Sequence, residues 1–151
     1  MFKIVRADSE NPDFIKLVQQ LDADLAIRDG IDNAFYAQYN KIDSIRHAVV
    51  AYLDNKPVAC GAIKQFAPGT MEVKRMFTLQ ENRGQGVALK ILNELEDWAH
   101  ELSYQTCILE TGKRQPEAIA LYKKAGYKII TNYGQYAGIE NSVCFEKQTK
   151  K

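Results

Sequence analysis

The stretch Met71-Glu72-Val73-Lys74-Arg75-Met76-Phe77-Thr78-Leu79-Gln80-Glu81-Asn82-Arg83-Gly84-Gln85-Gly86-Val87-Ala88 carries the clearest structural signal in the chain. It predicts a strand over 70–78, a glycine-containing turn, and an amphipathic helix that runs to about residue 102. Unpaired backbone N–H groups converge where such a turn enters a helix, and the helix dipole favours negative charge there. A phosphate site at this turn is one interpretation, and a plain helix-entry turn is the other.

Two familiar phosphate loops do not fit this turn. The dinucleotide fingerprint requires a third small residue where Leu89 follows Gly84 and Gly86, and no Gly-Lys-Ser/Thr follows as a nucleoside-triphosphate loop requires. A nucleotide-binding domain is therefore disfavoured.

Periodicity on either side of this stretch predicts a mixed α/β domain. Its central sheet is mostly antiparallel and its helices cover both faces, in the order β-α-α-β-β-β-α-β-α-β-β. Strands are expected at 2–6, 47–53, 58–66, 70–78, 106–110, 127–130 and 142–147. Helices are expected from residue 12, at 34–39, from about residue 87 to 102, and from residue 116 to Gly126. The expected core face of the long helix is Ala88, Leu92, Leu95, Ala99 and Leu102.

Length and charge place the chain among single globular domains. With 151 residues, 46% hydrophobic and 26% charged, we expect one domain over 1–147 and a short basic tail over 148–151. A net charge of +1 argues against binding nucleic acid through many phosphates. This balance hides an asymmetry, because residues 1–54 hold six basic and nine acidic side chains while the remainder holds fourteen and ten.

Cysteine usage and hydropathy favour the cytoplasm. The three cysteines, Cys60, Cys107 and Cys144, are widely spaced in apolar contexts, so we expect buried free thiols and neither a disulfide framework nor a metal site. The N-terminal residues do not resemble a signal peptide, and no apolar run is long enough to cross a membrane. We expect no membrane partner, and a homodimer is compatible with the sequence.

Two ordered motifs resemble the GNAT superfamily of acyl-CoA N-acyltransferases. Arg83, Gly86 and Ala88 fill the defined positions of its Arg/Gln-x-x-Gly-x-Gly/Ala motif. The strand end at Leu109-Glu110 and the segment 118–127, Ala-Ile-Ala-Leu-Tyr-Lys-Lys-Ala-Gly-Tyr, are similar to its second signature. Gln80 replaces a common proline, and Gln115 replaces an asparagine that commonly contacts the cofactor arm.

The resemblance implies transfer of an acetyl group from acetyl-CoA to a primary amine of a small molecule or peptide, through a tetrahedral intermediate. A non-catalytic acyl-CoA-binding module on the same fold is the alternative. No metal is implied. The resemblance assigns cofactor binding to Met76, Phe77, Thr78, Arg83, Gly84, Gln85, Gly86, Val87, Ala88 and Gln115.

Three residues are candidates for the chemistry. By the resemblance Tyr122 is the general acid, since a phenol is protonated at neutral pH, and core packing is its alternative. Glu72 and Glu110 both match positions of the general base. If Lys74 pairs with Glu72, that carboxylate becomes a poorer base and substrate positioning is left as its role. Structural ion pairs are the alternative for both glutamates.

The acceptor is not specified by the sequence. The resemblance implies an acceptor site built from the first two helices and the closing hairpin, so four acids, Asp22, Asp24, Asp29 and Asp32, are candidates for attracting a cationic amine. Tyr36, Tyr133 and Tyr136 lie in expected loops or a short helix, where tyrosines line small-molecule sites, interfaces or plain surface.

Overall fold

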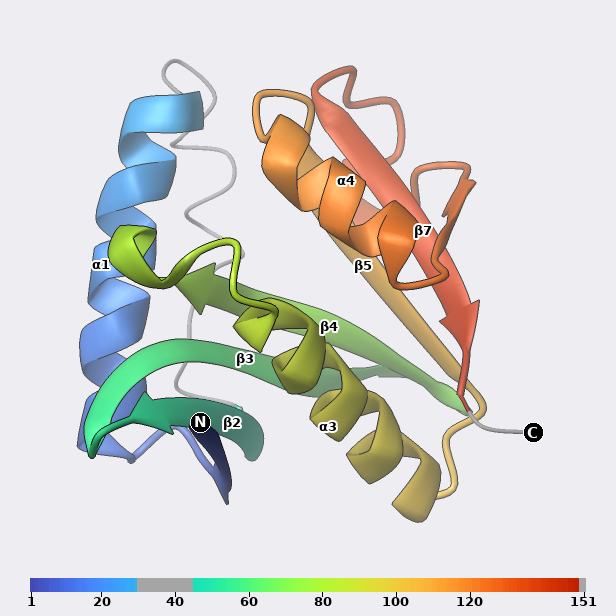
Figure 1. Ribbon diagram of the computed structural model, residues 1–151. Coiled ribbons are helices and arrows are strands. Elements are labelled where there is room, and N and C mark those ends of the chain that lie inside the picture. Colours follow the sequence, from blue (N-terminus) through green and yellow to red (C-terminus); the bar gives the residue numbers. More distant parts are fainter. Residues whose placement is uncertain (30–44, 150–151) are drawn as a thin grey trace.

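A computed structural model describes residues 1–29 and 45–149. Within these residues seven strands form one sheet in the order β1-β2-β3-β4-β5-β7-β6 (Figure 1). All neighbouring strands are antiparallel except β4 and β5, which are parallel. The strands are β1 (Phe2–Ala7), β2 (His47–Leu53), β3 (Lys56–Ala67), β4 (Thr70–Thr78), β5 (Thr106–Gly112), β6 (Lys128–Ile130) and β7 (Ser142–Gln148).

Helices cover both faces of this sheet. Helix α1 (Pro12–Asp29) packs on the face that carries Ala48, Val50, Cys60 and Ala62, whereas α3 (Val87–Glu101) and α4 (Pro116–Lys124) pack on the other face. Two short 3-10 helices, η2 (Gln80–Asn82) and η3 (Gly134–Tyr136), lie in the connections of the described part of the chain. The predicted fold class and order of elements are confirmed, and the helix predicted at 34–39 lies outside the described residues.

The parallel pair is short and then opens. Strands β4 and β5 pair only from Thr70↔Thr106 to Glu72↔Ile108, although β4 continues to Thr78 and β5 to Gly112. The two strands spread apart beyond this point like the arms of a V (Figure 1). The divergence of the two strands therefore begins directly after Glu72.

A β-bulge in β4 accompanies the opening. Cys60 pairs with Phe77 but Ala62 pairs with Lys74, so Gly61 faces two residues of β4. Arg75, one of those two, has a φ of 62°, a left-handed conformation that is strained for a side chain of this size. A Cβ at Gly61 would lie 2.5 Å from Met76 Sδ and 2.8 Å from Ile91 Cγ2, so a larger residue here would force these side chains to shift.

The helices begin and pack largely as their sequences predict. Asn11 caps α1 by accepting hydrogen bonds from the backbone N–H groups of Asp13 (2.9 Å) and Phe14 (3.0 Å). The core face of α3 differs from the prediction, because Val87 and Ile91 are buried whereas Leu102 is exposed. Leu92, Leu95 and Ala99 are buried as expected.

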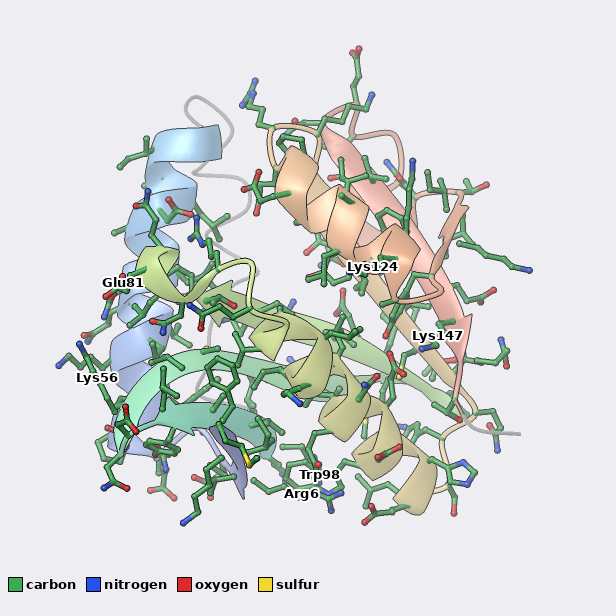
Figure 2. The ribbon with its side chains drawn as sticks, in the orientation of Figure 1. Arg6, Lys56, Glu81, Trp98, Lys124 and Lys147 are labelled. Carbon is green, nitrogen blue, oxygen red and sulfur yellow. The ribbon has the colours of Figure 1, made fainter. Side chains whose placement is uncertain are left out.

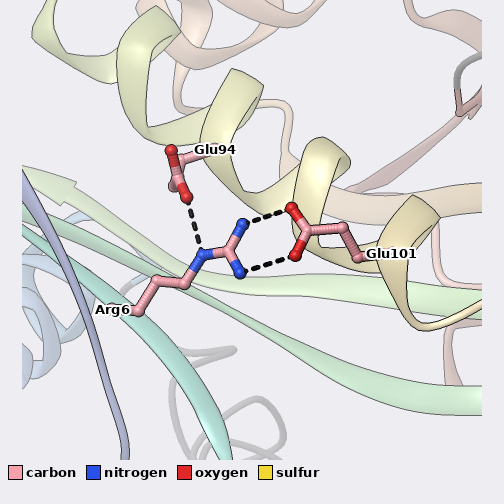
Figure 3. Close-up of polar contacts among 3 residues, drawn as sticks. All are labelled: Arg6, Glu94 and Glu101. Carbon is pink, nitrogen blue, oxygen red and sulfur yellow. Dashed lines mark hydrogen bonds and ion pairs between the residues drawn. The ribbon is translucent and has the colours of Figure 1, made fainter.

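Two polar clusters fix α3 against the sheet. Glu96 is buried where it accepts a hydrogen bond from Tyr127 (2.9 Å) and pairs with Lys147 (2.8 Å). At the opposite edge, the Arg6 guanidinium of β1 forms a bidentate pair with Glu101 (2.7 and 2.9 Å) and a further bond to Glu94 (2.7 Å; Figure 3). It also stacks 4.7 Å from the Trp98 ring, beneath α3 in Figure 2.

The last strand of the described chain is one residue longer than predicted. Strand β7 extends to Gln148, and the Thr149 hydroxyl donates to the Tyr104 carbonyl (2.9 Å). Strand β7 therefore ends one residue beyond the predicted 142–147, and residues 150–151 of the expected tail lie outside the description.

Replacing Arg6 by alanine will test how strongly the edge strand depends on α3. Arg6→Ala removes a bidentate ion pair, a second carboxylate contact and the packing on Trp98. We expect the free energy of unfolding to fall by about 1–2 kcal/mol, above the value of an isolated surface pair, because two carboxylates share one cation. Urea denaturation at low and high salt measures it, and the loss should shrink with salt.

Lys3→Ala provides the matched control, since Lys3 is an exposed cation of the same strand. Equal losses for the two variants would show that the Arg6 cluster does not stabilise the edge strand.

Candidate active site

A cleft of about 320 Å³ lies where the end of β4, the glycine turn and α4 approach one another. We call it the loop cleft. Among the predicted cofactor residues, all but Gln85 line it: Met76, Phe77, Thr78, Arg83, Gly84, Gly86, Val87, Ala88 and Gln115.

The glycine turn presents an open helix start to this cleft. Gly84 and Gly86 have φ values of 79° and 83°, and nothing lies within 4 Å of a Cβ built at either position. Gly86 is the N-cap of α3, no side chain caps the helix, and its first turn holds no acidic residue. The N–H groups of this turn are therefore suited to an anion such as a phosphate.

Charged and polar side chains frame the same cleft. The Arg83 side chain donates to the Thr78 carbonyl (3.0 Å) and lies over the Phe77 ring. Gln115 is the N-cap of α4, makes no side-chain cap bond, and lines the cleft. Asp24 of α1 lines this cleft as well, which differs from its predicted place on the acceptor side.

A second hollow of about 110 Å³ lies beside the first, and we call it the carboxylate cavity. Both predicted base candidates, Glu72 and Glu110, line it from opposite arms of the V. The two hollows share five lining residues, Leu21, Met76, Gln115, Ala118 and Tyr122. The opening between β4 and β5 is thus where they adjoin.

Tyr122 stands at this junction. It is buried, and its ring packs against Tyr127 and Phe145 at centroid distances of 5.9 and 5.8 Å. Burial first, and the charge of Glu110 second, raise the pKa of Tyr122 well above its ordinary value. The phenol is therefore protonated throughout the range in which proteins act, as a proton donor must be.

Glu72 is held by two partners. Its Oε2 accepts a hydrogen bond from the Tyr133 hydroxyl (2.7 Å), and its Oε1 lies 3.7 Å from Lys74 Nζ. Glu72 and Lys74 are each about nine-tenths buried. The predicted pairing of Glu72 with Lys74 is present, and it favours a positioning role for Glu72.

Glu110 occupies the facing arm. It lies near the end of β5, pairs in register with Cys144 of β7, and is close enough to Tyr122 and Tyr136 for its charge to raise the pKa of both phenols. One wall of the junction thus holds a carboxylate beside a protonated phenol.

The place of Arg75 and the contact of Tyr133 with Glu72 escaped sequence reasoning, whereas Tyr136 was one of the tyrosines considered for lining a small-molecule site. Arg75 lines the cavity and donates from Nη1 to Asp22 Oδ1 (2.9 Å), so Asp22 is paired within the protein. Tyr136 is buried in the cavity wall, and the neighbouring Tyr133 reaches Glu72. The run Asn132-Tyr133-Gly134-Gln135-Tyr136 indicated a loop, but nothing in it indicated which strand it contacts. The side chain of Asp29 and the whole of Asp32 lie outside the described residues.

Neither a metal cluster nor a membrane span occurs among residues 1–29 and 45–149. No group of three or more His, Cys, Asp or Glu side chains there is arranged to hold a metal ion. No helix in the same residues combines the length and apolar character that crossing a membrane requires.

Comparison with known proteins identifies the family. The profile of the Acetyltransferase (GNAT) family matches residues 9–127, so the chain belongs to this family. A structure from Klebsiella pneumoniae assigned to the acyl-CoA N-acyltransferases superposes with a TM-score of 0.83 at 28% identity, covering 99% of both chains. The PaiA N-acetyltransferase of Thermoplasma acidophilum, crystallised with coenzyme A, shares the fold at a TM-score of 0.72 and 16% identity, covering 98% of this chain and 99% of that one.

Curated relatives of the chain align with it over part of their length. An IAA acetyltransferase of Azospirillum brasilense is 36% identical over 100 residues, which are 66% of this chain and 65% of the relative. The chain spans 47% to 65% of the length of the first two curated relatives it matches.

Burial of the three cysteines predicts how slowly their thiols react with an alkylating reagent. Burial raises the pKa of Cys60 and Cys107 to about 12 and that of Cys144 to about 11, and all three are buried free thiols. At pH 8 the thiolate fraction is thus lower than that of an unperturbed thiol by more than about 100-fold. We expect native protein to resist iodoacetamide while urea-unfolded protein reacts at all three positions, as read by mass spectrometry. Rapid native alkylation of any one would contradict burial as its controlling feature.

Proposed function

We propose that this protein transfers an acetyl group from acetyl-CoA to a primary amine of a small molecule or peptide. The observation that carries the proposal is the junction of the loop cleft with the carboxylate cavity at Met76 and Tyr122. A thioester held on one side there faces an amine held on the other, without a covalent enzyme intermediate. Acetyl-CoA is supplied in the cytoplasm, which also keeps thiols reduced, so we place the reaction there.

The chain offers two features that suit acetyl-CoA. The helix start at Gly84 to Ala88, with Arg83 beside it, suits the CoA pyrophosphate. The β4 residues beyond Glu72 have no ladder to β5, so the extended pantetheine arm can lie along that edge like an added strand. A backbone N–H near residues 76–78 would then meet the thioester oxygen and stabilise the oxyanion of the tetrahedral intermediate.

Proton transfers complete the mechanism. The amine nitrogen bonds to the acetyl carbon, the carbon–sulfur bond breaks, and Tyr122 donates its proton to the departing thiolate. The proton lost by the amine passes to a carboxylate through water. Glu110 suits this role because it lies beside Tyr122, whereas Glu72 is engaged by Lys74 and Tyr133.

The function is tested by measuring release of the CoA thiol from acetyl-CoA in the presence of a panel of aliphatic and aromatic primary amines and peptides. Tyr122→Phe is the diagnostic variant. We expect kcat to fall by about 10² to 10⁴, the usual value of a general acid, while the KM values change little. Tyr127→Phe is the matched control, because it removes the hydroxyl of the neighbouring ring that bonds to Glu96.

Tight CoA binding without turnover of any amine would contradict the enzyme and favour a binding module. Equal kcat for Tyr122→Phe and wild type would remove Tyr122 from the mechanism while leaving the activity in place.

Gly86→Ala separates backbone strain from loss of the phosphate site. An alanine at φ 83° costs about 1 kcal/mol of folding free energy, and its methyl group would occupy the space proposed for the pyrophosphate. We expect the Kd for CoA, measured by calorimetry, to rise about 10-fold or more. Gly138→Ala is the control, because Gly138 has a similar φ of 78° and equally open surroundings outside the loop cleft.

Similar losses of stability in both variants with unchanged CoA affinity in Gly86→Ala would place the pyrophosphate elsewhere.

A further inference from the structure

Tyr133 makes a short polar contact with Glu72, a predicted site residue that lines the carboxylate cavity. Its hydroxyl donates to Glu72 Oε2 at 2.7 Å, across 61 positions of sequence. The other oxygen of the same carboxylate faces Lys74 at 3.7 Å. Both oxygens of Glu72 are thereby oriented by groups that the protein itself supplies.

The loop that carries Tyr133 is built to hold the ring still. The side-chain amide of Asn132 donates to the carbonyls of Ile139 (2.9 Å) and Ser142 (3.1 Å), which closes the base of the loop between β6 and β7. Phe66 of β3 and Tyr136 of η3 pack edge-on against the Tyr133 ring, at centroid distances of 5.0 and 5.8 Å. These contacts hold the hydroxyl in place before any acceptor arrives.

The hydroxyl remains a donor at any working pH. Burial, the negative charge of Glu72 and the hydrogen bond to it all raise the pKa of Tyr133 far above its ordinary value. A neutral phenol that donates to a carboxylate favours the ionised carboxylate. The Tyr133 hydroxyl is therefore a donor to Glu72 in the cavity wall.

We propose that Tyr133 is a positioning residue that holds the Glu72 carboxylate as a fixed anion for the ammonium group of the acceptor. The inference rests on the proposed function and divides the roles of the two glutamates. Glu72 binds and orients the acceptor, because a carboxylate retains further acceptor sites after one hydroxyl bond and one distant ion pair. Glu110, on the facing strand beside Tyr122, collects the proton.

A comparable bond elsewhere in the protein shows what a purely structural contact would do. The Tyr52 hydroxyl donates to Asp13 Oδ2 at 2.6 Å, also in a partly buried setting, but neither residue lines the cavity or the loop cleft. Tyr52→Phe and Tyr133→Phe each remove one hydroxyl from one carboxylate. The two variants therefore make the same chemical change, one at the carboxylate cavity and one away from both hollows.

The test is a double-mutant cycle of Tyr133→Phe and Glu72→Gln in the full chain, with the best primary amine found by the thiol-release panel as acceptor. We expect Tyr133→Phe to raise the acceptor KM about 10-fold, the effect of losing a hydrogen bond to a charged group. The KM for acetyl-CoA should stay within about twofold and kcat within about threefold. Because Tyr133 acts through Glu72, adding Tyr133→Phe to Glu72→Gln should cause little further change.

Two contrasts make the outcome decisive. Tyr52→Phe should leave both KM values unchanged while lowering the thermal midpoint about as much as Tyr133→Phe does, and Glu110→Gln should lower kcat and not acceptor affinity. Equal KM values in Tyr133→Phe and wild type, or fully additive effects in the cycle, would overturn the inference while the transferase activity stands. Lack of wild-type turnover with every amine would overturn the proposed function and this inference with it.

Discussion

The divergence of β4 from β5 after the Glu72↔Ile108 pair is the constraint on which the rest of the site depends. A continuous parallel ladder would seal the sheet and separate the face covered by α1 from the face covered by α3 and α4. Because the ladder stops, Tyr122 of α4 lies where it lines hollows that also include residues of α1. The opening leaves backbone groups of β4 without strand partners, and such groups require a ligand or water.

The bulge in β4 lies beside this opening and is strained in its local conformation. Arg75 adopts a left-handed φ, and its buried guanidinium forms an ion pair with Asp22 (2.9 Å), whose own side chain is half exposed. Arg75 combines a strained backbone with a buried charge, and both persist only where the surrounding packing holds them. Gly61 is part of that packing, because the absence of a side chain there leaves room for Met76 and Ile91. Met76, placed by this arrangement, then lines both hollows.

Local patterns were enough to predict most of the strands and helices, whereas the resemblance to the GNAT superfamily indicated most of the residues that line the loop cleft. The bounds of β2 and β4 match the prediction, and the glycines of the turn adopt positive φ as their chemistry allows. Contacts between distant segments could not be predicted this way. The burial of Glu96 depends on Tyr127 and Lys147, and the contact of Tyr133 with Glu72 depends on how the β6–β7 connection folds over β4. Asp24 illustrates the same limit, since helical periodicity places it on α1 without showing which hollow it faces.

The side chains at the junction also distinguish transfer through a covalent acyl-enzyme from direct attack by the amine. A covalent acyl-enzyme requires a nucleophile at the junction, and the described residues that line both hollows are Leu21, Met76, Gln115, Ala118 and Tyr122. Tyr122 is the one ionisable side chain among these five, and its raised pKa disfavours the phenolate that nucleophilic attack would need. The three cysteines line neither hollow, and burial raises the pKa of each thiol. The proposed direct attack by an amine, with Tyr122 as acid, needs no such nucleophile and is compatible with these side chains.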